Sequence, residues 1–209
     1  MSNRKLVIIL AGFLLFLLFV LFSYLVHKDL FTALDFDTTV RLQDNISRRF
    51  DTPFSSLSLF GSFEVATLIL IVLLVLSKRL KSILVLLSYT TVHLLELFGK
   101  IFVTHPGPPY LFFRYDIPFS FPSSYVQPGS SYPSGHSART AFISTILLLI
   151  VFRSKKLSGF QKAIIFSLVL LFDVTMFVSR IYLGEHWLTD VVGGAILGVA
   201  MGLLSAVLL

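Results

Sequence analysis

The sequence has no cysteine and little charge. Without a thiol, the chain offers no disulfide, no thiolate nucleophile and no thiolate-ligated metal site. Only 13% of its 209 residues are Asp, Glu, Lys or Arg and 56% are hydrophobic, whereas soluble domains are about a quarter charged. This composition excludes an ordinary soluble protein and indicates an integral membrane protein. The sequence also lacks internal repeats and low-complexity linkers, so we expect a single domain over residues 1–209.

The apolar residues fall into six stretches, at residues 6–26, 54–76, 82–103, 134–152, 162–178 and 187–209. A helix that crosses a membrane needs about 20 mostly apolar residues. The first, second and last stretches meet this length, and the other three reach it by including polar residues near their ends. The first is longer than a signal-peptide core and no small-residue cleavage site follows it, so we expect it to remain as a helix. The sequence therefore predicts an all-α fold, an integral membrane bundle of six transmembrane helices.

Lysine and arginine are concentrated in the connections on one side of this predicted bundle. The segment before the first stretch and the loops after the second and fourth carry several basic residues but no acidic one. The positive-inside rule predicts that both termini are cytoplasmic and that the remaining loops face the extracytoplasmic side of a plasma or inner membrane. The net charge of +6 mostly reflects this bias, so we predict no nucleic-acid partner.

The segment between the first two stretches, residues 27–53, is polar with scattered apolar residues. Phe36, Val40, Ile46 and Phe50 are spaced loosely along one helical face. A short amphipathic helix lying in the outer interface fits this spacing, and an ordinary surface loop fits it about equally well.

Three glycines in the last stretch, Gly194, Gly198 and Gly202, form a G-x-x-x-G-x-x-x-G row. Small residues at this spacing let two membrane helices approach closely. We assign the row to helix packing and not to ligand binding.

A longer motif precedes this glycine row, with the pattern S-R-x5-H-x3-D from Ser179 to Asp190. His186 and Asp190 are four residues apart and lie on one face of a helix, where the carboxylate can fix the imidazole tautomer and leave the other nitrogen free as a nucleophile. Arg180 offers a planar set of donors to phosphate oxygens. An H-x3-D pair by itself is more often a structural contact or part of a metal site.

The second motif is P-S-G-H at residues 133–136. The hydroxyl of Ser134 and nearby N–H groups at the start of a helix can donate to an anion, and Gly135 lets the backbone approach a ligand closely. His136 can then protonate a leaving oxygen. By itself the motif fits a turn and a helix cap, but the two motifs on one membrane face indicate cleavage of a phosphate ester. Since no carboxylate cluster accompanies the histidines on that face, we predict no metal site.

The third apolar stretch carries His93, Glu96 and Lys100 near one helical face. Ionisable groups inside a membrane helix tend to face the bundle interior or a wet cavity. Lys100 either serves the site in this way or extends to the interface with Glu96 as its partner.

With these residues the chain resembles the type 2 phosphatidic acid phosphatases (PAP2), the membrane branch of a superfamily that includes vanadium haloperoxidases. The family pattern is K-x6-R-P, P-S-G-H and S-R-x5-H-x3-D, and the second and third motifs are complete. The resemblance covers nearly the whole chain. It implies that His186 attacks phosphorus to form a phosphohistidine, that Asp190 orients it and that His136 protonates the leaving group, without metal or other cofactor. It also implies a set of residues that hold the phosphoryl oxygens: Lys100, Ser134, Gly135 and Arg180.

The first motif departs from the family pattern. Counting from Lys100 places Gly107 and Pro108 where the family has Arg-Pro. Loss of such a charge-assisted contact costs on the order of 1.5–3 kcal/mol of binding if nothing replaces it. His105, close in sequence, and Arg139, one turn after His136, are the candidate replacements as additional phosphate contacts.

The leading hypothesis is metal-independent hydrolysis of a lipid phosphate monoester or diphosphate at the extracytoplasmic membrane face. The resemblance implies polyprenyl diphosphate, phosphatidic acid, phosphatidylglycerol phosphate or a lipid A phosphate as substrates. Two alternatives stay open: a lipid phosphotransferase, and a non-catalytic membrane protein that binds lipid headgroups. We assign no oligomeric state.

Overall fold

The computed structural model describes residues 3–77, 83–117 and 130–208. Five helices are long and apolar enough to cross a membrane. They are α1 (Asn3–His27), α5 (Val85–Phe102), α6 (Gly135–Arg153), α7 (Gly159–Tyr182) and α8 (Leu188–Leu204). Large apolar side chains on α1, α5 and α7 point outward, for example Leu14, Leu97 and Leu171, as expected for helices whose solvent is lipid. The predicted all-α membrane bundle is confirmed.

The second predicted span is not one continuous helix. Residues 54–76 contain the end of α3 (Asp51–Ser58), a 3-10 turn (Leu59–Gly61) and α4 (Phe63–Leu76). The axis bends by 53° at this break, so the pair counts as a sixth span only if both halves are taken together. Ser62 causes the break: its backbone is extended and its hydroxyl accepts from the Val65 N–H to cap α4. Residues 54–76 therefore belong to the predicted sixth span only as part of this bent pair, and apolar length alone does not indicate the cap at Ser62.

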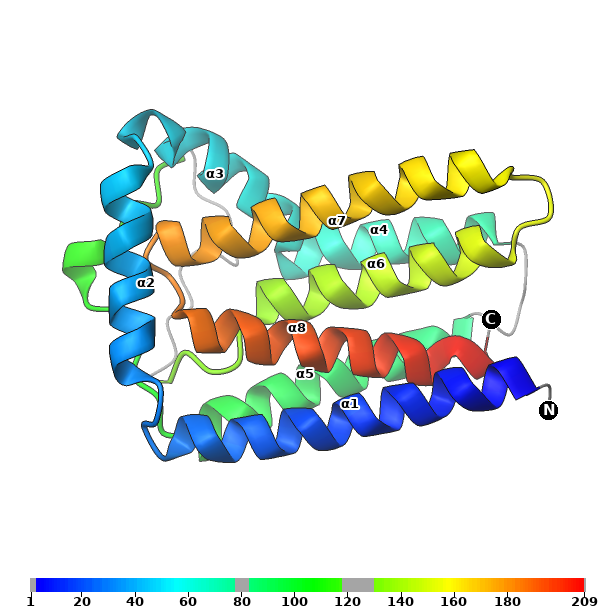
Figure 1. Ribbon diagram of the computed structural model, residues 1–209, viewed down its shortest axis with the longest axis horizontal. Helices are drawn as coiled ribbons and strands as arrows, with labels where there is room; N and C mark the ends of the chain where they lie inside the picture. Colours follow the sequence, from blue (N-terminus) through cyan, green and yellow to red (C-terminus); the bar gives the residue numbers. More distant parts are fainter. Residues whose placement is uncertain (1–2, 78–82, 118–129, 209) are drawn as a thin grey trace.

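The segment before α3 forms a helix that crosses the end of the bundle. This helix, α2 (Thr32–Asn45), packs on α7 and α8 and runs across the spans at one end of the bundle (Figure 1). The helical alternative is therefore confirmed for Thr32–Asn45, whereas Ile46 and Phe50 lie outside this helix. Its inward face is polar, however, because Asp35 and Thr39 are buried whereas Phe36 is half exposed.

Helix α8 lies between α6 and α1 and packs closely on both. A β-carbon on Gly194 would overlap the carbonyl oxygen of Ser134, and one on Gly198 would overlap that of Ala138. The glycine row therefore brings the backbones of α8 and α6 together, which confirms its packing role. This contact also brings the N-terminal ends of the two helices, which carry the two motifs, to the same end of the molecule.

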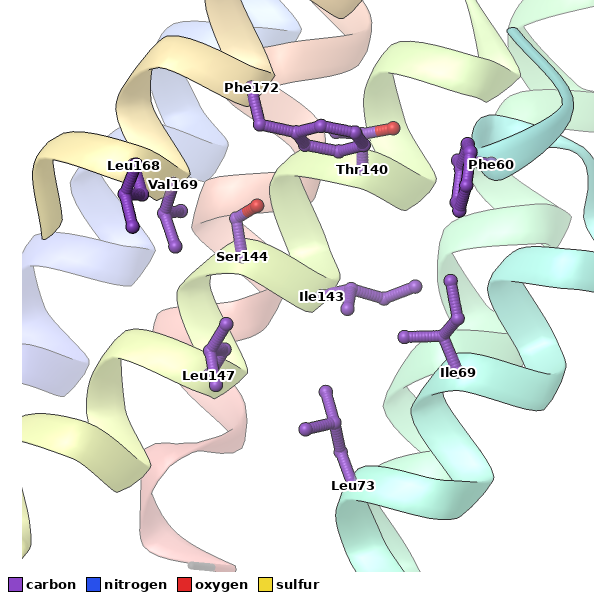
Figure 2. Close-up of a pocket in the computed structure, with 10 residues that line it drawn as sticks. All are labelled: Phe60, Ile69, Leu73, Thr140, Ile143, Ser144, Leu147, Leu168, Val169 and Phe172. Atoms are coloured by element: carbon purple, nitrogen blue, oxygen red, sulfur yellow. The ribbon is translucent and has the colours of Figure 1, made fainter. Parts of the chain in front are cut away.

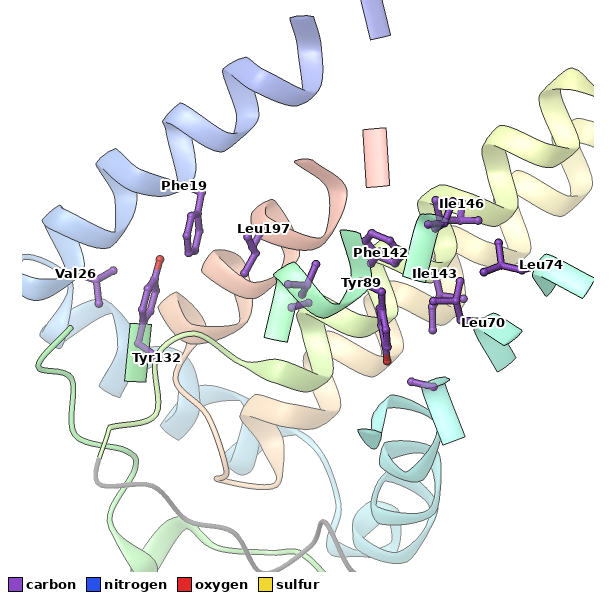
Figure 3. Close-up of a cluster of buried hydrophobic side chains, with 14 residues drawn as sticks. Phe19, Val26, Leu70, Leu74, Tyr89, Tyr132, Phe142, Ile143, Ile146 and Leu197 are labelled. Atoms are coloured by element: carbon purple, nitrogen blue, oxygen red, sulfur yellow. The ribbon is translucent and has the colours of Figure 1, made fainter. Parts of the chain in front are cut away.

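The buried apolar core extends along these helices (Figure 3). Tyr132, just before α6, stacks on Phe19 of α1 at a ring-centroid distance of 6.3 Å, and its hydroxyl bonds to Ser23 at 2.9 Å. Leu197 and Phe142 continue the core between α8 and α6. Both chain termini lie at the far end of the bundle from α2 and from the α7–α8 connection (Figure 1).

Candidate active site

The connection from α7 to α8 positions the predicted nucleophile. Gly184 has a φ of +69°, and a β-carbon there would overlap the carbonyl of Phe112, so this tight turn requires glycine. His186 follows, and its Nδ1 lies 3.4 Å from Oδ2 of Asp190 in the first turn of α8. The same oxygen accepts the Trp187 N–H at 2.9 Å. Asp190 is fully buried and the His186 side chain is 13% exposed, so the dyad of these two residues is desolvated yet reachable.

The charge state of His186 depends on burial and on Asp190. Burial lowers the pKa of His186, while the hydrogen bond and charge of Asp190 oppose this shift, and Arg180 and Lys100 lower the pKa further. The imidazole is therefore neutral at pH 7. If Nδ1–H donates to Asp190, the lone pair on Nε2 is free for attack.

The second motif is joined to the first through the backbone. The Ser134 N–H donates to the Asp190 carbonyl at 2.9 Å. The Ser134 hydroxyl caps α6, where it accepts from the backbone N–H of Ser137 at 3.4 Å and from its hydroxyl at 3.1 Å. Ser134 is fully buried, so its main role here is to fix the helix start. The first N–H groups of α6, those of Gly135 and His136, have no partner within the helix and can donate to an anion.

His136 stands in that first turn and is half-buried. Gly61, at the break before α4, packs against it: a β-carbon on Gly61 would lie 3.0 Å from Cδ2 of the imidazole. Arg180, Arg139, His186 and Lys100 all interact electrostatically with His136. The candidate acid, the candidate nucleophile and three cations therefore share one region.

Two of these cations meet at a carboxylate. Glu96 Oε1 lies 2.8 Å from Lys100 Nζ, and Oε2 lies 3.1 Å from Arg139 Nη1. His93 Nδ1 is 3.5 Å from Oε2. The Glu96 carboxylate also occupies the space where a β-carbon of Gly135 would be. The sequence indicates Glu96 only as a partner of Lys100, whereas in the structure its carboxylate joins Lys100 and Arg139 beside the second motif.

The third cation is Arg180, which is fully buried in the last turn of α7 and not beyond the helix end. It donates to the Ser58 hydroxyl and pairs with the carboxylate of Glu185. Arg139 also contacts the broken span, because its Nε donates to the Gly61 carbonyl at 2.8 Å. Residues at the break before α4 therefore hold both arginines in place.

His105 lies behind Asp190. Its Nε2 is 3.5 Å from Asp190 Oδ1, 3.6 Å from Asp35 Oδ2 and 3.2 Å from the Thr189 hydroxyl. The structure thus brings His105 to the catalytic carboxylate and not to the cations. Asp35 and Thr189 had no sequence signal, since one lies in the outer helix and the other reads as an ordinary residue of the last span.

Within the described ranges, no group of three or more His, Asp or Glu side chains has an arrangement that could hold a metal ion. The site consists of a His–Asp dyad at the start of α8, a second histidine at the start of α6 and three cations from α5, α6 and α7. This arrangement is suited to a phosphoryl group.

Comparison with known proteins shows the family of the chain. A model of the PAP2 superfamily matches residues 66–209. The chain belongs to the PAP2 superfamily. The matched residues contain the whole of both complete motifs and Lys100.

Two solved PAP2-type structures share the fold. One is a transmembrane PAP2-type phosphatidylglycerolphosphate phosphatase from Bacillus subtilis, with a TM-score of 0.71 and 21% identity over 91% of each chain. The other is LpxE from Aquifex aeolicus, with a TM-score of 0.61 and 25% identity over 82% of this chain and 94% of that one. The chain is thus a multi-pass membrane protein of the PAP2 fold.

A curated relative matches over a shorter region. Phosphatidylglycerophosphatase B of Bacillus subtilis (strain 168) is 31% identical over 71 residues, which are 34% of this chain. The match spans 35% of that relative, about a third of its length.

This PAP2 protein has Gly107 where the family pattern places an arginine. A β-carbon on Gly107 would meet Ser131 at 3.4 Å, an ordinary contact, so the position has room for a side chain. Arg139 reaches the cation cluster from α6 instead, one turn after His136.

Proposed function

We propose that this PAP2 protein hydrolyses the phosphate monoester or diphosphate of a membrane lipid through a phosphohistidine, without a metal. The observation that carries the proposal is the buried His186–Asp190 dyad beside His136 and the cations Lys100, Arg139 and Arg180. A binding protein would need the cations alone, and it would not need a neutral, carboxylate-oriented histidine.

In the first step, Nε2 of His186 attacks phosphorus, and the bond between phosphorus and the leaving oxygen breaks. His136 acts as the general acid and gives a proton to that oxygen. In the second step, His136 takes a proton from water, the resulting hydroxide attacks the phosphohistidine, and phosphate leaves as the N–P bond breaks. The cations and the N–H groups of the α6 first turn stabilise the equatorial oxygens in both steps.

A groove beside the site supports a substrate with a lipid tail. It has a volume of about 300 Å³ and lies between α4, α6 and α7 (Figure 2). Thr140, one turn after His136, and Phe60, next to Gly61, line it near the site, and Ile143, Leu147 and Leu73 line its apolar part. A phosphate held at the cations would leave its hydrocarbon chain in this groove or in the adjoining lipid.

The test is release of inorganic phosphate by purified protein in detergent with EDTA, beside His186→Ala. The panel contains phosphatidylglycerophosphate and a lipid A phosphate, named for the relatives, with phosphatidic acid, polyprenyl diphosphate and a short-chain analogue. We expect release that survives EDTA, disappears in the variant and is faster with long tails. Transfer of label to a second lipid without free phosphate would instead indicate a phosphotransferase. Binding without reaction would indicate a headgroup-binding protein.

A further inference from the structure

The catalytic carboxylate has a second histidine on its far side. Asp190 Oδ2 is occupied by His186 and by the Trp187 N–H. Its Oδ1 is buried and makes no well-aligned hydrogen bond within the described part of the chain, and His105 Nε2 lies 3.5 Å from it. Because Asp190 is fully buried, the group facing Oδ1 affects both its orientation and its charge.

The hydrogen bonds around His105 indicate which nitrogen carries a proton. The Thr189 hydroxyl donates to Asp35 Oδ2 at 2.8 Å, so its oxygen is left to accept from His105 Nε2 at 3.2 Å. Nε2 therefore carries a hydrogen, and this N–H points into the space between Thr189 and the two carboxylates. His105 thus turns an N–H, and not a lone pair, toward Asp190 Oδ1, which lies 3.5 Å from Nε2.

Two further elements hold His105 in place. Asp35 of α2 accepts the Thr189 N–H at 2.8 Å as well as its hydroxyl, so α2 is bound to the first turn of α8. The His105 carbonyl accepts from the Ser131 N–H at 3.0 Å and from the hydroxyls of Ser130 and Ser131. His105, Asp35 and Thr189 are all buried, which makes this a rigid support and not a surface contact.

We propose that His105, supported by Asp35 and Thr189, is a positioning residue that presents an N–H to Asp190 Oδ1 and keeps the carboxylate turned toward His186. This proposal rests on the proposed function, because His105 would support the same His186–Asp190 dyad. The titratable groups facing His105 are Asp35 from α2, Asp190 from α8 and Tyr132 from the segment before α6, whose ring is 6.4 Å away. Burial raises the pKa of Asp35, and the charge of Asp190 raises it further. The N–H of His105 therefore faces one buried carboxylate from α2 and one from α8.

The test measures kcat, KM and the pH profile of phosphate release for His105→Ala, His105→Gln and the control His27→Gln. His27 accepts from the Thr104 N–H at 3.3 Å, next to His105 in sequence, but it is exposed and does not contact the dyad. Since removal of the imidazole also opens a cavity, the glutamine variant keeps an N–H donor and much of the volume.

We expect His105→Ala to lower kcat about 10- to 100-fold, the usual effect of losing an outer-shell partner, with KM nearly unchanged because the cations are intact. Loss of the donor raises the proton affinity of the dyad, so the acid limb of the profile moves to higher pH. His105→Gln should recover part of both effects, and His27→Gln should match the wild type. An unchanged kcat and acid limb in His105→Ala would overturn the proposal, as would a rise in KM alone, which would make His105 a phosphate ligand.

A wild type that releases no phosphate from any lipid would overturn the proposed function instead. In that case, NMR titration of the His186 imidazole tests the inference. Its signal is identified among those of the five histidines by its absence in His186→Ala. A dyad that titrates at higher pH in His105→Ala than in the wild type and His27→Gln supports the positioning role. Coinciding titrations would refute it.

Discussion

At the scale of single residues, the chemistry depends on side chains that share carboxylates. Asp190 links His186 to His105, and Glu96 links Lys100 to Arg139. Each carboxylate holds its partners before a substrate arrives, which reduces the reorganisation that catalysis requires. The sequence contains these residues. Each carboxylate also binds a partner far away in the chain, however, as Glu96 binds Arg139 and Asp190 lies beside His105.

Asp190→Asn should lower kcat about 10³- to 10⁴-fold, because an amide cannot hold the His186 tautomer that leaves Nε2 free. In the wild type, kcat should fall as pH falls through the pKa of His186, which burial places below its ordinary value. Asp190 opposes that shift, so residual activity of the variant should persist to lower pH. Profiles of kcat against pH check both points; an acid limb that moves upward would contradict this account.

Arg139→Lys should raise KM about tenfold or more, because a charge-assisted donor to phosphate contributes on the order of 1.5–3 kcal/mol and lysine cannot also bond the Gly61 carbonyl. Arg153→Lys, at the opposite end of α6, is the matched control and should leave KM unchanged. Steady-state kinetics of phosphate release measure both. Since Gly107 has room for a side chain, Gly107→Arg in the Arg139→Lys background should restore part of the affinity. An unchanged KM in Arg139→Lys would remove Arg139 from the phosphate site.

At the scale of helices, the site is built where elements begin or break. Helices α6 and α8 start beside each other, and the break before α4 supplies Ser58 and Gly61. Helix ends leave backbone N–H groups free for an anion. The close contact of α8 with α6 is what aligns their starts, and it depends on glycine.

Gly198→Ala should destabilise the protein by about 1–3 kcal/mol, a typical cost of overpacking, because the new methyl would overlap the Ala138 carbonyl. The separation of α8 from α6 should also reduce kcat. Gly159→Ala is the matched control: nothing lies within 4 Å of its β-carbon position, so stability should be unchanged or slightly higher. Thermal unfolding in detergent measures the difference. Equal melting temperatures for the two variants would show that the glycine row is not needed for packing.

At the scale of the whole molecule, both termini lie at one end and the site lies at the other (Figure 1). The exposed loop between α6 and α7, with Lys155 and Lys156, is at the end of the termini. The positive-inside rule then directs the site to the extracytoplasmic face, where we propose that it acts.

Because the chain has no cysteine, single cysteines report this orientation directly. We expect Asp37→Cys, on the exposed side of α2, to react with a membrane-impermeant maleimide in intact cells. Lys155→Cys should react only after permeabilisation. The reverse pattern would place the site in the cytoplasm.

The sequence by itself determined the membrane class, the helical fold and the chemistry of both motifs. Apolar length and i, i+4 spacing are local properties, so the spans and the His186–Asp190 dyad could be recognised without a structure. Only the tertiary structure decided that Ser62 breaks the second span, that α2 turns Asp35 inward and that His105 supports Asp190. These contacts join segments separated by up to 154 residues or depend on one cap. No local pattern encodes which distant partner a buried polar group will meet.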